Sequence, residues 1–170
     1  MIEQSCAFTG HRPTRFTFAY DEADPRCVAL KAKLAEEIEK MIKEGVNRFY
    51  SGMALGVDQW AAQAVLNLKA SYSNIQLIAV LPCENQSNRW SSEQQTDYSA
   101  ILEKCGEIQT IGKHYTPQRM FQRNRRLVDQ ARHLIAVYDG KPGGGTAYTV
   151  NYALRKGRKV TVIDNQIYHQ

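Results

Sequence analysis

The sequence of 170 residues lacks several features that define common protein classes. It has no apolar run near the roughly twenty residues that a membrane-spanning helix needs. Its first ten residues, MIEQSCAFTG, contain no basic segment followed by a long apolar one, which argues against a signal peptide. No repeat, low-complexity tract or linker interrupts the chain. We therefore expect one domain over residues 1–170, a cytoplasmic location and no membrane partner.

Cysteine is scarce and is not arranged for metal binding. The four cysteines, Cys6, Cys27, Cys83 and Cys105, are widely spaced and form no CxxC pair, so we expect no zinc or other metal site. Reduced thiols are the expectation for a cytoplasmic chain. Cys6 lies within an apolar run and is predicted to be buried, whereas Cys83 ends another run near a candidate site.

Acidic residues are fewer than basic ones. The chain has 17 Asp and Glu against 22 Lys and Arg, which gives a net charge of +5. This balance suits anionic ligands such as nucleotides or nucleic acid, although a modest positive charge also simply aids solubility. Apolar residues make up 43% and charged residues 23%, the composition of an ordinary globular protein.

Strand-like and helix-like patterns alternate along the whole chain. The expected strands are 4–8, 47–51, 75–81, 107–111, 133–138 and 159–164, and the expected helices are 25–44, 56–69, 90–104, 117–130 and 146–156. Asp24 and Thr116, each followed by proline, are typical helix N-caps. The alternation predicts a Rossmann-like, doubly wound α/β fold with a mainly parallel sheet of five to six strands and helices on both faces.

Ligands of such sheets bind at the carboxyl ends of the strands, where the strand order reverses. The first expected strand leads into Thr9-Gly10-His11-Arg12. The guanidinium of Arg12 is a rigid, permanently charged fork that suits phosphate. His11 could donate to phosphate, act as an acid or base near neutral pH, or cap the loop.

The second expected strand leads into SGMALGVD, which contains Ser51, Gly52, Ala54, Gly56 and Asp58. Its spacing resembles a phosphate-binding turn between a strand and a helix. Asp58 falls in the first turn of that helix, where an acidic residue complements the helix dipole. The alternative role of Asp58 is a hydrogen bond to a ribose hydroxyl.

The fifth expected strand leads into DGKPGGGT, residues 139–146. Gly143, Gly144 and Gly145 would let backbone N–H groups approach an anion, and Thr146 would begin a helix whose N-terminus favours negative charge. The alternative is a flexible turn. Three strand ends of similar chemistry together favour a phosphate site.

The expected helix after Thr116 carries a row of arginines. Arg119, Arg123 and Arg126 follow helical spacing and share one face, so they repel one another unless an anion or acidic residue compensates. The alternative is a solvated face partly balanced by Asp129. Asn124 interrupts the apolar side of this helix and either finds a buried partner or faces a site.

The third expected strand leads into PCENQSNRW, which holds Glu84, Gln86 and Trp90. Trp90 could stack on a base or simply pack against the core, and Tyr148 is the second candidate for the base. Asp139 is a further candidate for ribose hydroxyls.

The motifs GHRP, SGMALGVD, P-x-x-x-Q-x-x-x-W, RN and GGTAYTVNYA occur in order over essentially the whole chain. In this respect the sequence resembles the YpsA/YoqJ-like families of the SLOG superfamily. The resemblance implies a Rossmann-like fold and a nucleotide or nucleotide-derived ligand. It implies no known activity.

Two relatives in that superfamily imply contrasting functions. LOG phosphoribohydrolases carry PGGxGTxxE with an essential glutamate, and Thr149 occupies that position here. A carboxylate normally stabilises the oxocarbenium-like state of such hydrolysis, so LOG-type catalysis is not expected unless Asp58, Asp139 or Glu84 substitutes.

The DprA-type single-stranded DNA binders contain SGxAxGID, which is similar to SGMALGVD. Single-strand binding normally combines a basic groove with several stacking aromatics. No clustering of aromatics with arginines is visible in this sequence. We therefore expect a binder of a nucleotide-derived small molecule that needs no cofactor. A nucleotide-processing enzyme and a nucleic-acid binder are the alternatives, and homo-oligomers are compatible with each.

Overall fold

The structure is a computed structural model that describes residues 2–164, and it confirms the predicted alternation of strands and helices. The strands are β1 (Ser5–Gly10), β2 (Arg48–Ser51), β3 (Gln76–Cys83), β4 (Glu107–Gly112), β5 (His133–Val137) and β6 (Lys159–Ile163). The helices are α1 (Pro25–Lys43), α2 (Val57–Leu68), α3 (Ser92–Glu103), α4 (Pro117–Asp129) and α5 (Gly144–Arg155). Asp24 and Thr116 cap α1 and α4 with their side chains, as predicted.

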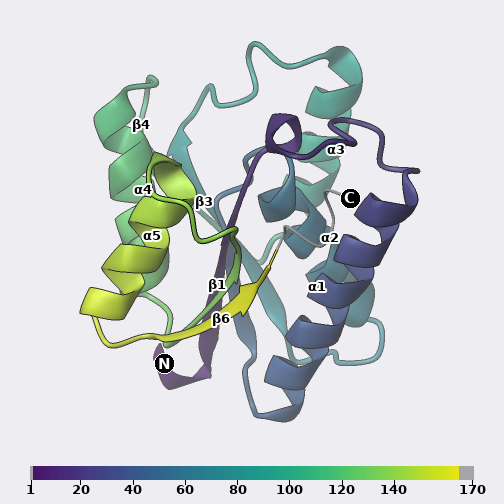
Figure 1. The fold of residues 1–170 in the computed structure, drawn as a ribbon, viewed down its shortest axis with the longest axis vertical. Helices are drawn as coiled ribbons and strands as arrows, with labels where there is room; N and C mark the ends of the chain where they lie inside the picture. The colour runs from purple at the N-terminus through teal and green to yellow at the C-terminus, as the bar shows by residue number, and fades with distance from the viewer. Residues whose placement is uncertain (1, 165–170) are drawn as a thin grey trace.

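The six strands form one parallel sheet in the order β4-β3-β2-β1-β5-β6. The chain moves outward from β1 to β4, and α4 then carries it back to β5 on the other side of β1. Helices α1, α2 and α3 cover one face of the sheet and α4 and α5 the other (Figure 1). The Rossmann-like, doubly wound fold is thereby confirmed, and the strand order reverses between β1 and β5.

Apolar side chains fill both faces of the sheet. On the side of α1 and α2, Phe8 of β1 stacks on Phe49 of β2 with ring centroids 6.0 Å apart. On the side of α4 and α5, Ala7 and Tyr50 belong to a second, smaller cluster. Because the central strands are buried on both faces, they are apolar almost throughout, as the run IQLIAVL predicted.

The long segment between β1 and α1 is anchored by aromatic packing. The rings of Phe16 and Phe18 lie 4.9 Å apart, and Phe16 is 5.7 Å from the ring of Trp60 in α2. Both phenylalanines are buried. This packing holds Arg12 and its neighbours beside the carboxyl edge of the sheet.

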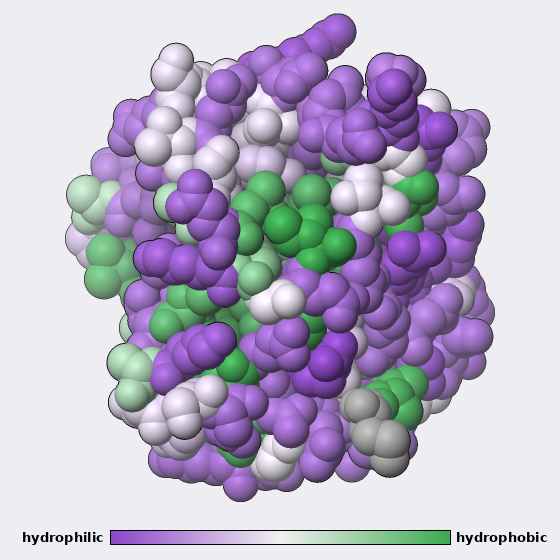
Figure 2. Space-filling view, turned by 180° about the vertical axis from the view of Figure 1, so that it is seen from behind, coloured by the Kyte–Doolittle hydropathy of each residue, from purple (hydrophilic) through white to green (hydrophobic). Residues whose placement is uncertain are grey.

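The surface outside that edge is mostly polar. Figure 2 shows the side opposite to that of Figure 1, where hydrophilic residues surround a central hydrophobic area and smaller ones nearer the margin. The two edge strands each expose an apolar side chain, Ile108 on β4 and Val162 on β6. Among residues 2–164, no helix combines the length and the apolar character that crossing a bilayer requires.

Candidate functional site

A cleft of about 440 Å³ opens at the carboxyl edge of the sheet, where the strand order reverses. Its walls come from the end of β1, the turn before α2, helix α4 and the first turn of α5. Ten of the residues predicted from the sequence line it: Thr9, Gly10, His11, Arg12, Ala54, Asp58, Arg123, Asn124, Gly145 and Thr146. The predicted convergence of several strand ends is therefore a feature of the structure.

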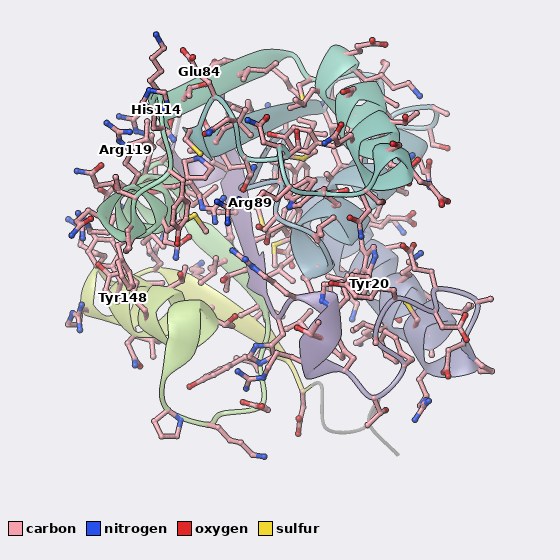
Figure 3. All side chains as sticks on the ribbon, turned by 90° about the horizontal axis from the view of Figure 1, so that it is seen from above. Tyr20, Glu84, Arg89, His114, Arg119 and Tyr148 are labelled. Carbon is pink, nitrogen blue, oxygen red and sulfur yellow. The ribbon has the colours of Figure 1, made fainter. Side chains whose placement is uncertain are left out.

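A second compartment of about 570 Å³ adjoins the cleft on the side of β3. The two share Arg12 and Ala54, together with Tyr115 and Met120. Gln86 and Trp90 line the second compartment, as predicted. Arg89 also lines it, and Figure 3 shows Arg89 over the middle of the sheet edge.

Three charged residues meet in the cleft. Arg123 and Asp58 are both buried, and Arg12 lies close enough to affect both electrostatically. Burial raises the pKa of Asp58 although Arg123 and Arg12 act to lower it. Burial lowers the pKa of Arg123, and repulsion from Arg12 adds to this while Asp58 opposes it. Two arginines therefore share one buried carboxylate, and the cleft keeps an excess of positive charge.

The turn between β2 and α2 is held together by its own hydrogen bonds. The Ser51 hydroxyl donates to the carbonyl oxygen of Asp58 over 2.8 Å and accepts from the Met53 N–H over 3.2 Å. The Asp58 carboxylate accepts from the Ala54 N–H over 3.2 Å. Met53 has a φ of 60°, which is unusual for a residue with a side chain. This turn is therefore a rigid support.

Arg123 reaches this turn from helix α4. Its Nη1 donates to the Gly52 carbonyl oxygen over 2.6 Å, and its Nε donates to the side-chain oxygen of Asn124 over 2.9 Å. A Cβ at Gly52 would lie 2.5 Å from Nη1 of Arg123, so only glycine leaves room for this guanidinium. The sequence predicted that Asn124 would either bond to a buried partner or face a site. It does both, since it bonds to Arg123 and lines the cleft.

His11 connects the loops on either side of the strand-order reversal. Its Nδ1 lies 3.4 Å from the Thr146 hydroxyl, and its Nε2 lies 3.8 Å from a carboxylate oxygen of Asp139. The same carboxylate lies 3.4 Å from Nη2 of Arg15 and accepts from the Lys141 N–H. Burial opposes ionisation of Asp139, but the Lys141 N–H, His11 and Arg15 outweigh it and lower its pKa. Asp139 therefore joins two loops and does not line the cleft.

The glycine run before α5 faces open space. Gly143 and Gly144 have φ angles of 89° and 86°, and a Cβ at either would meet nothing within 4 Å. The helix begins at Gly144, two residues before the predicted start, so Gly145 and Thr146 lie in its first turn. Free N–H groups of this turn are directed toward the cleft that Gly145 and Thr146 line.

Several predicted site residues lie elsewhere. Tyr148 does not line the cleft; it faces helix α4, where its hydroxyl accepts from Arg125 and its ring contacts Phe121. Glu84 is exposed and lines neither compartment, because it leaves β3 on the solvent side. The structure therefore places Tyr148, the predicted base contact, and Glu84, a candidate catalytic carboxylate, outside the cleft.

Other predicted contacts prove to be structural. The Ser51 hydroxyl is used within its own turn and is fully buried. Gly52 and Gly56 line neither compartment. Instead, Gly52 makes room for Arg123, and a Cβ at Gly56 would lie 2.8 Å from the His11 carbonyl oxygen. Thr149 is buried and donates to the carbonyl oxygen of Gly145, so it takes no place in the cleft.

The predicted arginine row does not form one exposed face. Arg123 is buried and points into the cleft, whereas Arg126 is exposed. Arg119 bonds to the His114 carbonyl oxygen at the start of the same helix. The helical spacing of the three arginines predicted that they lie on one side of α4. It could not predict that Arg123 alone among them lines the cleft.

Tyr115, Met120 and Arg89 line the site and were not predicted. Tyr115 and Met120 border both compartments, and the Tyr115 side chain is 60% exposed. The sequence offered one indication for Tyr115, namely its position directly before Thr116, the N-cap of α4. Trp90 instead packs its ring edge against Tyr98 with centroids 5.0 Å apart, so it is partly a core residue.

Comparisons with known proteins show the family and the fold of the chain. A model of the YpsA family, described as the YspA SLOG family, matches residues 6–167. The chain belongs to this family. The SPbeta prophage-derived protein YoqJ of Bacillus subtilis is 32% identical to this YspA-family chain over 158 residues, which cover 85% of the chain and 89% of YoqJ. A UPF0398 protein of Bacillus thuringiensis is 26% identical and covers 89% of the chain and 83% of its own length.

Solved structures of DNA processing protein A, DprA, share the fold of this YspA-family protein. The Streptococcus pneumoniae protein superposes with a TM-score of 0.63 at 20% identity, over 95% of the chain but only 50% of that DprA. The Helicobacter pylori protein superposes with a TM-score of 0.64 at 20% identity, over 96% of the chain and 66% of that DprA. The latter structure concerns the single-stranded DNA binding mode of the Helicobacter pylori protein. The chain thus spans half to two thirds of these proteins.

Proposed function

We propose that this protein binds a nucleotide or nucleotide-derived small molecule in the cleft and acts as a sensor or sequestering protein. The observation that carries the proposal is the charge in the cleft: Arg12 and Arg123 share the single buried carboxylate of Asp58. Arg123 is buried and Arg12 is exposed, so two cations face one carboxylate, and the buried guanidinium gains from any further negative charge nearby. A phosphate group would supply the missing negative charge.

The surroundings of the two arginines suit a phosphate in particular. The first turn of α5, with Gly145 and Thr146, offers N–H groups and the positive end of a helix dipole. The rigid turn that holds Asp58 closes the opposite wall. Asp58 is the better candidate for a ribose hydroxyl, because Asp139 is engaged by His11 and Arg15.

The second compartment suits the base of the same ligand. Tyr115 is exposed where the two compartments meet, and Trp90 lines the far part. Aromatic rings bind bases by stacking. Arg89 adds a further cation there. Phosphate in the first compartment and base in the second is therefore the arrangement we propose.

A nucleotide-processing enzyme remains the alternative from the class of catalysts. Thr149 cannot replace the glutamate of the LOG enzymes, since it lacks a carboxylate and its hydroxyl donates to the Gly145 carbonyl oxygen. Asp58 is the carboxylate closest to the proposed ligand. Release of free base or ribose phosphate, lost in Asp58→Asn, would favour this alternative.

The ligand test is calorimetric titration with mono-, di-, cyclic and ADP-ribose-type nucleotides. We expect at least one to bind the wild type, and Arg12→Ala to weaken that binding by about tenfold or more, because a charge-assisted hydrogen bond is lost. Arg126→Ala is the matched control, as it removes an exposed arginine that does not line the cleft. If no nucleotide binds, or if the two variants weaken binding equally, the proposal fails.

A further inference from the structure

Helices α4 and α5 lie side by side on one face of the sheet (Figure 1). Aromatic and cationic side chains of the two helices meet between them. We define the α4–α5 seam as Phe121, Arg125, Tyr148, Tyr152 and Lys156. Figure 3 shows Tyr148 at the outer side of the molecule, whereas Arg89, which lines the second compartment, lies over the sheet edge. Of the seam residues only Phe121 lines the cleft, so the rest of the seam lies outside it.

The rings of the seam form a continuous series. Phe121 of α4 meets Tyr148 of α5 edge to face, with centroids 4.7 Å apart. Tyr148 and Tyr152 are nearly parallel, with centroids 6.4 Å apart. Phe121 is 40% exposed, and both tyrosines are partly exposed. The clustering of aromatics with arginines that the sequence did not reveal is thus present in the structure.

Cations accompany the two tyrosines of this series. Arg125 donates to the Tyr148 hydroxyl over 2.9 Å. The guanidinium of Arg155 and the ammonium of Lys156 lie 6.0 and 5.8 Å from the centre of the Tyr152 ring. Asp129 is the acidic residue here: it accepts from the Tyr152 hydroxyl over 2.8 Å and lies 3.8 Å from Lys156. Positive charge clearly exceeds negative charge along the seam.

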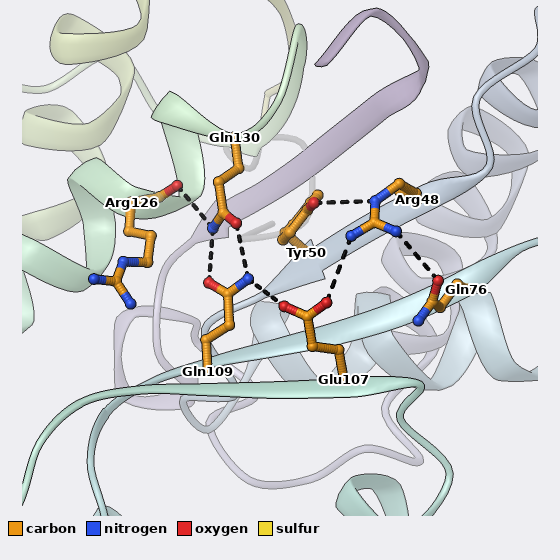
Figure 4. A network of polar contacts seen from close by, with 7 residues as sticks. All are labelled: Arg48, Tyr50, Gln76, Glu107, Gln109, Arg126 and Gln130. Atoms are coloured by element: carbon orange, nitrogen blue, oxygen red, sulfur yellow. Dashed lines mark hydrogen bonds and ion pairs between the residues drawn. The ribbon is translucent and has the colours of Figure 1, made fainter. Parts of the chain in front are cut away.

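A shallow hollow of about 560 Å³ adjoins the seam, shares Arg125 with it and is also lined by Asp129. Its other lining residues are Arg126 and three glutamines, two of which, Gln109 and Gln130, bond to each other (Figure 4). Within residues 2–164, no hydrogen bond or ion pair involves the guanidinium of Arg126. The aromatic rings of the seam therefore lie next to a hollow that contains the unpaired guanidinium of Arg126.

We infer that the α4–α5 seam and this hollow bind single-stranded nucleic acid. Unpaired bases would stack on Phe121 and the exposed parts of the tyrosines, and phosphates would follow Arg125 and Arg126. In a duplex the faces of the bases are covered by neighbouring bases, so a duplex could contact the cations through its phosphates but could not stack on the rings. A second copy of the chain is disfavoured, since a symmetric contact would bring the same cations together. The inference does not depend on the nucleotide proposed for the cleft.

The test measures fluorescence anisotropy of a labelled oligothymidylate and of a duplex of equal length. We expect the single strand to bind more tightly and its affinity to fall with salt. Tyr152→Leu, which removes a ring, should weaken binding about tenfold, whereas Tyr152→Phe, which keeps the ring, should change it by less than about twofold. Arg126→Ala should lower the slope of log K against log salt by about 0.7.

Tyr20→Leu is the matched control, because it removes a tyrosine that is 57% exposed on another side of the molecule (Figure 3). Thermal melting of each variant establishes that it is folded. Absent binding at low salt, or equal weakening by Tyr20→Leu and Tyr152→Leu, would overturn the inference. So would a dimer in sedimentation that Tyr152→Leu dissociates, since a second copy would then cover the seam.

One further arm separates this surface from the cleft. An excess of the nucleotides used in the calorimetry should leave strand binding unchanged, and so should Arg12→Ala. If Arg12→Ala abolishes strand binding, the strand occupies the cleft and the inference for the seam is wrong. If no nucleotide binds the cleft but the seam variants behave as expected, only the proposed function fails.

Discussion

Two glycine-containing turns lead from a strand into a helix at the same edge of the sheet, yet they differ in construction. In the turn between β2 and α2, Cβ atoms at Gly52 and Gly56 would lie 2.5 and 2.8 Å from neighbouring atoms. In the turn between β5 and α5, Cβ atoms at Gly143 and Gly144 would meet nothing within 4 Å. The first turn is closed by packing, and the second is open.

This difference assigns the two turns different tasks. The closed turn satisfies its own polar groups through Ser51 and Asp58 and receives Arg123 against the Gly52 carbonyl oxygen. The open turn leaves N–H groups at the start of α5 available to a ligand. Similar glycine patterns thus support the arginine side chain in the first turn and leave the backbone open to a ligand in the second.

The largest effect is expected from Gly56→Ala in the closed turn. Gly56 has a φ of 94°, and its new Cβ would lie 2.8 Å from the backbone oxygen of His11, which cannot move aside freely. We expect the free energy of unfolding to fall by about 3 kcal/mol in urea titrations.

Gly140→Ala is the matched control for this substitution. Gly140 has a similar φ of 81° but open space around its Cβ position, so only backbone strain of about 1 kcal/mol is expected. Equal losses in the two variants would mean that packing does not distinguish the turns.

Asp58→Asn is expected to have a smaller effect, which depends on pH. Because the folded-state pKa of Asp58 is raised, the folded protein keeps a proton that the unfolded chain releases. The wild type therefore loses stability as pH rises from the unfolded value of about 3.9 through the raised value.

Asparagine does not ionise and can still accept from the Ala54 N–H, so the variant lacks this loss with pH. It also removes the negative charge that faces the buried Arg123, which opposes the gain at neutral pH. The expected outcome is therefore a free energy of unfolding that falls less steeply than that of the wild type as pH rises above about 4, measured by chemical denaturation. An equally steep pH profile in the two proteins would show that ionisation of Asp58 does not cost stability.

Gly145→Ala in the open turn is expected to have the smallest effect on stability. Its Cβ would lie 3.7 Å from the side-chain nitrogen of Asn124, an ordinary contact, and alanine favours a helix over glycine. The free energy of unfolding should rise by about 0.5 kcal/mol, while nucleotide affinity falls because the methyl group enters the cleft. Unchanged affinity in calorimetry would exclude this turn from ligand binding.

Most of the fold could be predicted because its signals are local. Apolar periodicity, the caps Asp24 and Thr116 and the run IQLIAVL locate the elements without reference to distant residues. The strand ends that differ from the prediction depend on pairing with a neighbouring strand. β1 continues to Gly10 because its pairing with β5 continues to Val137, and β3 continues to Cys83 because it pairs with Gly112.

The candidate site was predictable in part. Residues directly after the strands reach the cleft because parallel strands all end at the same edge, which is how His11, Arg12, Asp58 and Thr146 come together. Side-chain direction is not set by position alone. Tyr148 belongs to the motif that begins with the glycine run, yet its side chain faces helix α4 and bonds to Arg125.

The order of elements, the doubly wound topology and the edge at which a ligand would bind follow from periodicity and chain direction, so the residue pattern was enough to predict them. The burial of Arg123 beside Asp58 and the exposure of Arg126 depend instead on how the helices pack. Tertiary packing also decided that one glycine turn is packed and the other open, and that Phe121, Tyr148 and Tyr152 form one series. These properties depend on which side chains of α4 and α5 face each other across the fold, and residue spacing within one helix cannot reveal that.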